Sequence, residues 1–147
     1  MKKTVLIFII SAMVFANEMS LDMVCNNVEQ HDVEAMMGKT FKYERVGKMT
    51  FPHTSYCEYG NSVLPEVTIY YYKTKSNVNV YDKTKEIKGL HFPVQAVFVP
   101  SSGDVVQIVS RTKEGTLSFV FNNGIKEGDA HYKKALELID KLSKQFP

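Results

Sequence analysis

The sequence predicts an α+β fold, in which helices pack on a mainly antiparallel sheet and an amphipathic helix closes the chain. Several short segments carry apolar side chains at every second position and are separated by turns that contain glycine. Two stretches with helical spacing each precede three of these segments. We therefore expect two successive α-β-β-β units, side by side in one sheet.

Two helix signals open the first unit. Ser20 is a candidate cap for a short helical turn that carries Cys25. Asp32 is a stronger candidate cap, because an apolar helical face follows it and Gly38 supplies a C-terminal stop. The spacing therefore predicts a helix over 32–37.

Alternating apolar residues predict the strands of this unit. They lie at 40–46, 55–59 and 66–73. The last strand has the clearest pattern, in which Val67, Ile69 and Tyr71 point to one face. Tyr70 and Tyr72 then point to the opposite face. We expect the Val67 face to cover the core.

The second unit has the same order of elements. Ser76 is a candidate cap for a helix that ends at Lys88, because Thr84 and Ile87 align on one helical face and Gly89 follows. Short turns that contain glycine then separate three further segments with strand alternation. These strands lie at 94–99, 104–111 and 116–121.

The end of the chain has the strongest helical pattern. Asn122-Asn123-Gly124 is expected to end the strand meander, and a helix is expected from Asp129 to Lys144. Its apolar stripe consists of Tyr132, Ala135, Leu136, Ile139 and Leu142.

Residues 1–16 have the features of a cleavable secretory signal peptide. Lys2 and Lys3 form a positive start, an apolar stretch of about 12 residues follows, and Val14-Phe15-Ala16 fits a cleavage site. This stretch is shorter than the ~20 residues that cross a bilayer, which makes an uncleaved anchor the less favoured alternative. We expect one exported domain, residues 17–147, periplasmic or secreted and without stable membrane insertion after cleavage.

The charge of this domain argues against a polyanionic partner. The full chain has 18 Lys and Arg residues and 16 Asp and Glu residues. Because the signal peptide contains two lysines and no acid, the remaining domain has equal numbers of basic and acidic residues. No short window concentrates Lys and Arg, so we expect no nucleic-acid partner. We also expect a monomer.

Cys25 and Cys57 are the two cysteines of the chain. An even pair in an exported domain predicts a disulfide. The alternative is a nucleophilic thiol at Cys57 with His53 nearby in the sequence. The disulfide is favoured because the domain has an even number of cysteines and no Cys-Xaa-Xaa-Cys spacing.

Motifs for catalysis and cofactor binding are missing. The sequence has no nucleophile elbow, zinc-protease helix, phosphate loop or dinucleotide-binding glycine motif. Four acidic residues are expected in strands or turns: Glu58, Glu66, Asp104 and Glu114. We interpret them as solvated. The alternative is that two of them meet in one cleft as an acid/base pair. The four histidines lack metal-ligand spacing: His31, His53, His91 and His131. We expect no catalytic residue, cofactor or metal.

The candidate binding residues are aromatic. Tyr70 and Tyr72 share one strand face, and tyrosine is enriched in protein interfaces because it combines apolar area with a hydroxyl. The alternative is that a helix covers this face and buries both rings. His91 and Phe92, before the second meander, are a weaker candidate for the rim of a cleft.

The order of motifs resembles a family of exported domains. Cys25, the Asp-Val-Glu-Ala-Met-Met-Gly segment at 32–38 and Ser-Tyr-Cys-Glu-Tyr at 55–59 are similar to the opening of small exported bacterial domains of unknown function and of the PknH-like extracellular sensor domain. Ile-Lys-Gly-Leu at 87–90 and Ala-Leu-Glu-Leu-Ile at 135–139 match its second half in outline. The resemblance implies a sheet-and-helix domain that binds a ligand or protein in the cell envelope.

Three functions follow as hypotheses. The first is a protein-interaction module of inhibitor or immunity type, which uses Tyr70 and Tyr72. The second is a small-ligand sensor or carrier domain with a cleft between sheet and helices. The third is a hydrolase-type enzyme that gathers acids or histidines in one cleft.

Overall fold

The protein folds into one antiparallel sheet with helices on it, as the computed structural model shows for residues 22–47, 54–73 and 84–147. The helices are α1 (Met23–Asn27), α2 (Gln30–Met37) and α3 (Ala130–Gln145). The strands are β1 (Tyr43–Val46), β2 (Thr54–Gly60), β3 (Val67–Tyr72), β4 (Thr84–Ile87), β5 (Val94–Phe98), β6 (Val105–Arg111) and β7 (Thr116–Ile125). The predicted α+β class with its C-terminal helix is confirmed.

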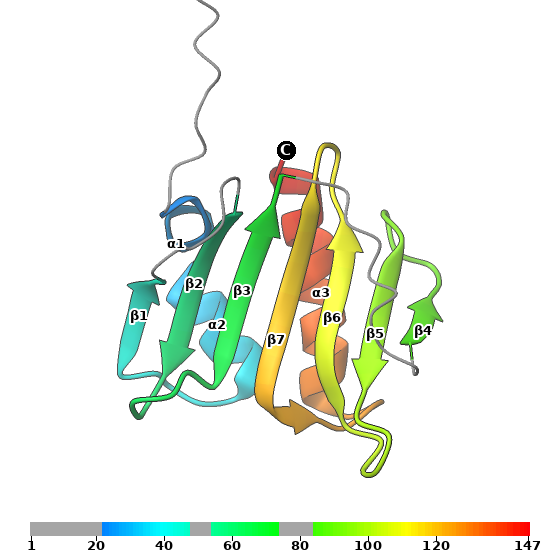
Figure 1. Cartoon of the computed structure of the whole chain (residues 1–147), viewed down its shortest axis with the longest axis horizontal. Helices are drawn as coiled ribbons and strands as arrows, with labels where there is room; N and C mark the ends of the chain where they lie inside the picture. Colours follow the sequence, from blue (N-terminus) through cyan, green and yellow to red (C-terminus); the bar gives the residue numbers. More distant parts are fainter. Residues whose placement is uncertain (1–21, 48–53, 74–83) are drawn as a thin grey trace, which may run out of the picture.

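Two meanders make up the sheet. Its strand order is β1-β2-β3-β7-β6-β5-β4, so each meander pairs strands that follow one another in the chain (Figure 1). The meanders join where β3 pairs with β7, with Ile69 opposite Phe119. The centre of the sheet therefore combines strands from both halves of the sequence.

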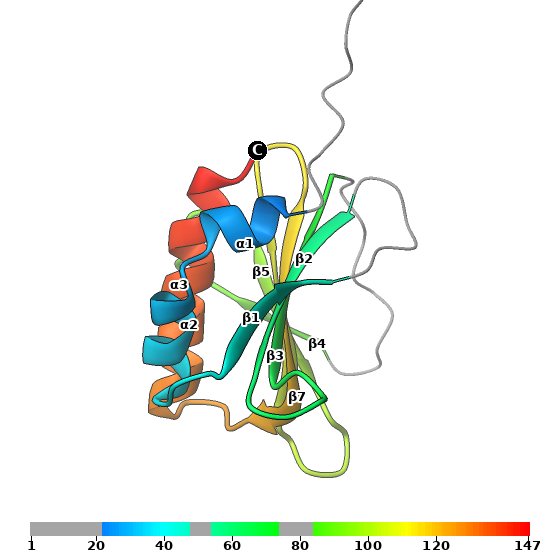
Figure 2. The same cartoon turned by 90° about the vertical axis from the view of Figure 1, so that its left-hand side faces the viewer.

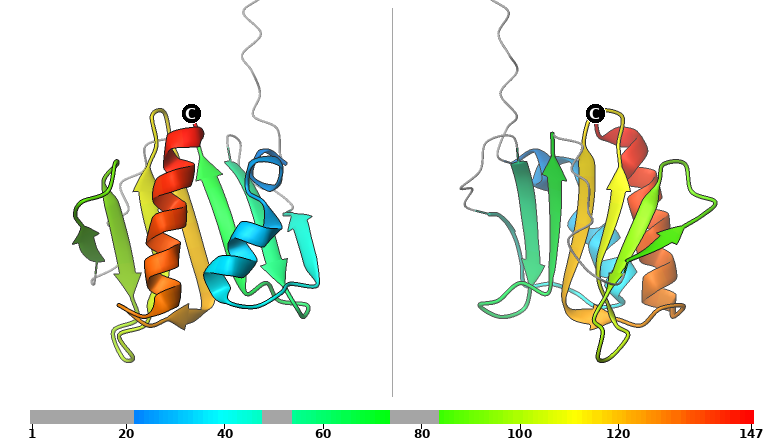
Figure 3. Two further views of the ribbon diagram at one scale, coloured as in Figure 1. Left: turned by 180° about the vertical axis from the view of Figure 1, so that it is seen from behind. Right: turned by 45° about the vertical axis from the view of Figure 1, so that its right-hand side comes forward.

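All three helices lie on the same face of the sheet. Figure 2 shows the sheet edge-on with the helices on one side, and Figure 3 shows α2 and α3 next to each other across it. The core forms between these layers, from alternate strand positions and the inner sides of the helices. Its central members include Val67, Ile69, Tyr71, Leu117, Phe119, Phe121, Ala135, Ile139 and Leu142.

The C-terminal helix matches its sequence pattern. Asp129 caps it, because its carboxylate accepts a hydrogen bond from the backbone N–H of Tyr132 at 2.8 Å. The stripe residues Tyr132, Ala135, Ile139 and Leu142 are buried, whereas Leu136 is half-buried. Leu138, which is not part of the predicted stripe, is also buried. Phe146 follows the helix and packs on Tyr71, with ring centroids 5.2 Å apart.

The predicted helix from Ser76 to Lys88 is wrong for its last turn. Thr84–Ile87 form the edge strand β4, which pairs antiparallel with β5. Thr84 and Ile87 are β-branched and fit a strand as well as a helix, and pairing with a neighbouring strand decided between the two. The first part of the predicted helix, residues 76–83, lies outside the described residues.

The predicted break at Asn122-Asn123-Gly124 is also wrong, because β7 continues to Ile125. The ladder to β6 is irregular there: Gln107 pairs with Val120, but Val105 pairs with Ile125. Gly124 allows this bulge, since it has φ +66° and a Cβ at this position would lie 2.9 Å from the Cβ of Asp104.

Asp32 is not the cap of α2. The helix begins at Gln30, after Glu29 in extended conformation, and Asp32 lies in its first turn. There its carboxylate pairs with Lys141 of α3 at 2.9 Å, and its negative charge also suits the start of a helix. Gly38 ends α2 in the left-handed conformation, as predicted.

No helix within residues 22–47, 54–73 and 84–147 is long and apolar enough to cross a bilayer. Residues 1–21 lie outside the described part of the chain, as does His53. The signal peptide at 1–16, the domain boundary at residue 17 and the Ser20 cap therefore stay predictions.

Candidate functional site

The face of the sheet opposite the helices carries a continuous group of aromatic and charged side chains. We call it the tyrosine strip, and it consists of Tyr43, Arg45, Tyr56, Glu58, Tyr70 and Tyr72. Strand alternation explains the group, because the cross-strand pairs Arg45–Glu58 and Tyr56–Tyr70 stand on the face opposite Cys57 and Ile69.

Three half-buried tyrosines form one end of the strip. The ring of Tyr70 stacks on Tyr56 with centroids 5.1 Å apart, and on Tyr72 with centroids 5.7 Å apart. Burial raises the pKa of all three hydroxyls above their usual value of 10.0, that of Tyr72 to about 12. The three hydroxyls therefore stay protonated near neutral pH and are able to donate hydrogen bonds.

A charged pair continues the strip towards the sheet edge. The Nε of Arg45 lies 2.5 Å from a carboxylate oxygen of Glu58. The same guanidinium lies 4.6 Å from the ring centre of Tyr43 and donates a hydrogen bond to the carbonyl of Val63 at 3.3 Å. Arg45 thus links the strip to the turn between β2 and β3.

That turn presents apolar side chains to solvent. Val63 is 86% exposed and Leu64 is 73% exposed. Two neighbouring exposed apolar side chains are available for contact with a partner, and the hydrogen bond from Arg45 to Val63 places this turn next to the charged end of the strip. The turn therefore extends the candidate surface beyond the strip.

The structure separates the two predicted candidate groups. Tyr70 and Tyr72 lie on the face that no described helix covers. His91 and Phe92 lie in the β4–β5 connection, where the backbone N–H of His91 donates to Asp140 of α3 at 2.7 Å. Strands β7 and β6 stand between β3 and β5. The two groups therefore do not form one site.

Sequence reasoning missed Tyr43, Arg45 and Tyr56 as members of the surface. A signal was present for Tyr56, since alternation in the strand at 55–59 places it opposite Cys57. Its position beside Tyr70 depends on the β2–β3 register, which the sequence does not state.

The helix side contains a cavity of about 380 Å³ at the end of the sheet where α2 ends and α3 begins. Lys39 and Glu66 on its wall form an ion pair. His131 makes a hydrogen bond through Nδ1 to the carbonyl of Met36, and Asp129 caps α3. These polar groups thus have partners within the protein.

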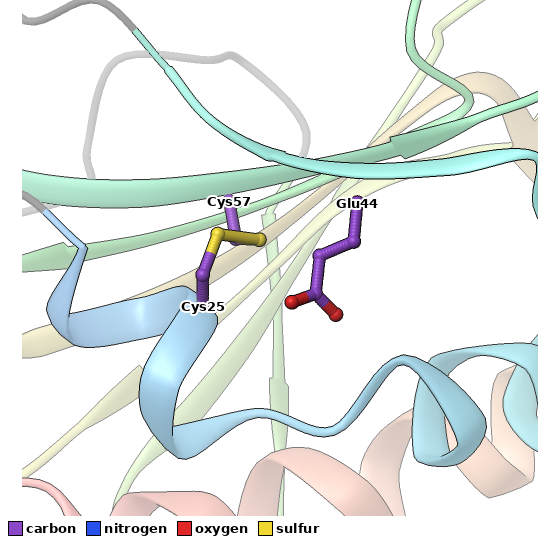
Figure 4. A group of neighbouring side chains, drawn as sticks. All are labelled: Cys25, Glu44 and Cys57. Carbon is purple, nitrogen blue, oxygen red and sulfur yellow. A yellow bond between two sulfur atoms is a disulfide. The ribbon is translucent and has the colours of Figure 1, made fainter.

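A third cluster surrounds the predicted disulfide, which the structure contains between Cys25 and Cys57 with Cα atoms 5.1 Å apart. The carboxylate of Glu44 points towards it (Figure 4), and one ligand atom from each of these residues lies within 4.8 Å of the others. Desolvation by neighbouring protein atoms raises the pKa of Glu44. In the described part of the chain this is the one group of three or more such potential ligands.

Comparison of the chain with protein-family models, curated proteins and solved structures finds no significant match. The resemblance to the PknH-like extracellular sensor domain therefore stays a prediction.

Proposed function

We propose that this chain is an exported, non-catalytic domain that binds a protein partner through the tyrosine strip, as an interaction module of inhibitor or immunity type. The observation that carries the proposal is the stacked row Tyr56–Tyr70–Tyr72 on the face opposite the helices. The core does not need these rings, because the helix-side residues of β2 and β3 supply it.

The geometry of the row favours a protein over a sugar or a flat aromatic ligand. Strand side chains stand roughly perpendicular to their sheet. Rings stacked in this way cover one another's faces and leave their edges for contact. Such a surface suits contacts with a protein, and Arg45 connects the strip to the turn that carries the exposed Val63 and Leu64.

The disulfide supports the exported location in this proposal. Disulfides persist in oxidising compartments and are rare in the cytosol. The predicted signal peptide at residues 1–16 points to the same location. We propose a periplasmic or secreted protein.

The test is affinity capture with tagged protein, residues 17–147, from envelope and culture extracts of the parent organism. The captured protein is purified, and its affinity for the wild-type chain is compared with that for Tyr70→Ala/Tyr72→Ala. We expect the affinity to fall at least tenfold, by about 1.4 kcal/mol or more, because tyrosines that become buried in an interface are frequent hot spots. The melting temperature should fall by only a few degrees.

The matched control is His91→Ala/Phe92→Ala, which removes two aromatic rings outside the strip. This variant should bind the partner as the wild type does. Unchanged affinity of the tyrosine variant, or a loss confined to the His91/Phe92 variant, would contradict the proposal.

A small-ligand sensor or carrier is the second candidate, and the cavity beside α3 favours it. Its volume of about 380 Å³ lies in the usual range for small-molecule sites. A thermal-shift screen of envelope metabolites tests it, since a ligand that binds the folded state raises the melting temperature. The shift should disappear in Gly38→Leu, whose side chain meets His131 on the cavity wall. Because Gly38 has φ +65°, this variant is less stable without ligand, and its own melting temperature is the baseline for the shift.

A further inference from the structure

Three side chains that bind metals well converge beneath the β1 edge of the sheet. They come from α1, β1 and β2, and they are Cys25, Glu44 and Cys57. In the oxidised protein the two sulfurs bind each other and cannot hold a metal. Reduction of the disulfide frees them beside a carboxylate that already points at them (Figure 4).

Contacts other than the disulfide hold the two cysteines near each other. The backbone N–H of Val24 donates to the hydroxyl of Ser55 at 3.0 Å, which attaches α1 to β2. Val24 and Val28 are fully buried, and the hydroxyl of Tyr59 donates to the carbonyl of Val28 at 3.2 Å. The residues before and after Cys25 therefore stay attached to β2 when the sulfurs separate.

The β1–β2 register holds the third ligand. Val46 pairs with Cys57 and Glu44 pairs with Tyr59, so Glu44 stands on the same sheet face as Cys57. Glu44 is exposed, Cys25 is half-buried and Cys57 is buried. An ion can therefore enter from the side of Glu44 without opening of the core.

We propose that the reduced chain binds one Zn²⁺ through the sulfurs of Cys25 and Cys57 and a carboxylate oxygen of Glu44, and that oxidation to the disulfide releases the ion. Two thiolates and a carboxylate are suitable zinc ligands, and a water completes the tetrahedron. Tetrahedral zinc needs its ligand atoms about 3.5–3.8 Å apart. The bonded sulfurs separate on reduction, and all three ligand atoms lie within 4.8 Å, so shifts of about 1–2 Å give this geometry.

The redox step balances with a thiol as reductant. Two thiol molecules give two electrons and two protons to the disulfide, which yields two cysteine thiols and one external disulfide. Binding of Zn²⁺ then displaces the two thiol protons into solvent. A newly made chain holds the same two thiols before its disulfide has formed. This site is independent of the tyrosine strip.

The test is anaerobic titration of the reduced chain with Co²⁺, followed by displacement with Zn²⁺. We expect binding of one ion per chain, with the intense near-ultraviolet absorption of thiolate–cobalt charge transfer. Cys57→Ser should lose this absorption. Glu44→Gln should bind at least about tenfold more weakly, since loss of an outer-shell group alone often costs that much.

Glu58→Gln is the matched control, because it removes one carboxylate next to Cys57 on the opposite sheet face. The affinity of reduced Glu58→Gln for Co²⁺ should equal that of the reduced wild type. If circular dichroism shows that the reduced chain is unfolded, Co²⁺ should restore the folded spectrum in wild type at a concentration that leaves Glu44→Gln unfolded. Equal binding by the oxidised chain, equal binding by Glu44→Gln, or no thiolate absorption would overturn the proposal.

Discussion

Tyr70 and Tyr71 are neighbours in the sequence and serve opposite faces of β3. The ring of Tyr71 is 1% exposed and packs on Phe146 in the core. The ring of Tyr70 stands on the other face, between Tyr56 and Tyr72. One strand thus carries a stability residue and a candidate binding residue side by side, and substitutions at the two positions should have different effects.

Tyr71→Phe should lower stability without changing partner binding. The Tyr71 hydroxyl donates to the carbonyl of Pro147 at 2.9 Å, which attaches the chain end to the sheet. Loss of such a bond costs about 0.5–1.5 kcal/mol. Urea unfolding measures the change in the free energy of unfolding. A loss of partner affinity with unchanged stability would contradict this division between the two faces.

Gly47→Ala should disturb the tyrosine strip without removing any of its atoms. A Cβ at residue 47 would fall within the ring of Tyr56, so this ring must leave its present position and its stacking on Tyr70 must change. We expect weaker partner binding, and about 1–3 kcal/mol lower stability from overpacking.

Gly128→Ala is the control for that variant. Gly128 has φ +82° with nothing within 4 Å of an added Cβ, so alanine costs about 1–2 kcal/mol through backbone strain alone. Its stability should fall by a similar amount while partner binding stays intact. If both glycine variants lose binding equally, general destabilisation and not the position of Tyr56 is responsible.

Removal of the disulfide should destabilise the chain strongly. Cys25 and Cys57 are 32 residues apart, and the chain-entropy estimate for a loop of this size is about 3.7 kcal/mol. Cys25→Ser/Cys57→Ser should therefore lose up to that amount in urea unfolding. Intact mass should show the untreated protein lighter than the reduced form by two hydrogens. Two free thiols in protein expressed in the periplasm would argue against the bond.

Acid should destabilise the protein through paired carboxylates. Hydrogen bonds from Gln30 and the backbone N–H of Phe41 lower the pKa of Glu34 from its usual 4.5, and Lys39 lowers that of Glu66. Because the folded state binds these protons less readily than the unfolded state, the stabilisation is complete above about pH 4.5 and is lost as the pH falls through the folded pKa values.

Glu34→Gln isolates one contribution to this acid dependence. The variant should be less stable than the wild type at neutral pH, and its free energy of unfolding should fall less steeply below about pH 4.5. Urea unfolding at successive pH values measures both effects. An identical acid profile for variant and wild type would show that Glu34 titrates alike in the folded and unfolded states.

Local patterns in the sequence determined much of the fold. Alternation in 66–73 placed Tyr70 and Tyr71 on opposite faces, and helical periodicity with the Asp129 cap located α3 to within one residue at each end. The cysteine count predicted the disulfide, which the structure contains. The strand alternation and the helix depend on residues close together in the chain, and two cysteines can form only one disulfide. These features can therefore be predicted without knowledge of the tertiary contacts.

Only the tertiary structure decided which segments are neighbours. Thr84–Ile87 became a strand because β5 was available to pair with it, and β7 continued past Asn122 because β6 accommodated a bulge. The same reason applies to the candidate sites. Tyr56 meets Tyr70, and Glu44 meets the disulfide, through the β2–β3 and β1–β2 registers and the packing of α1. Strand pairing is a contact between distant residues, whereas periodicity reports only which side of its own element a residue occupies.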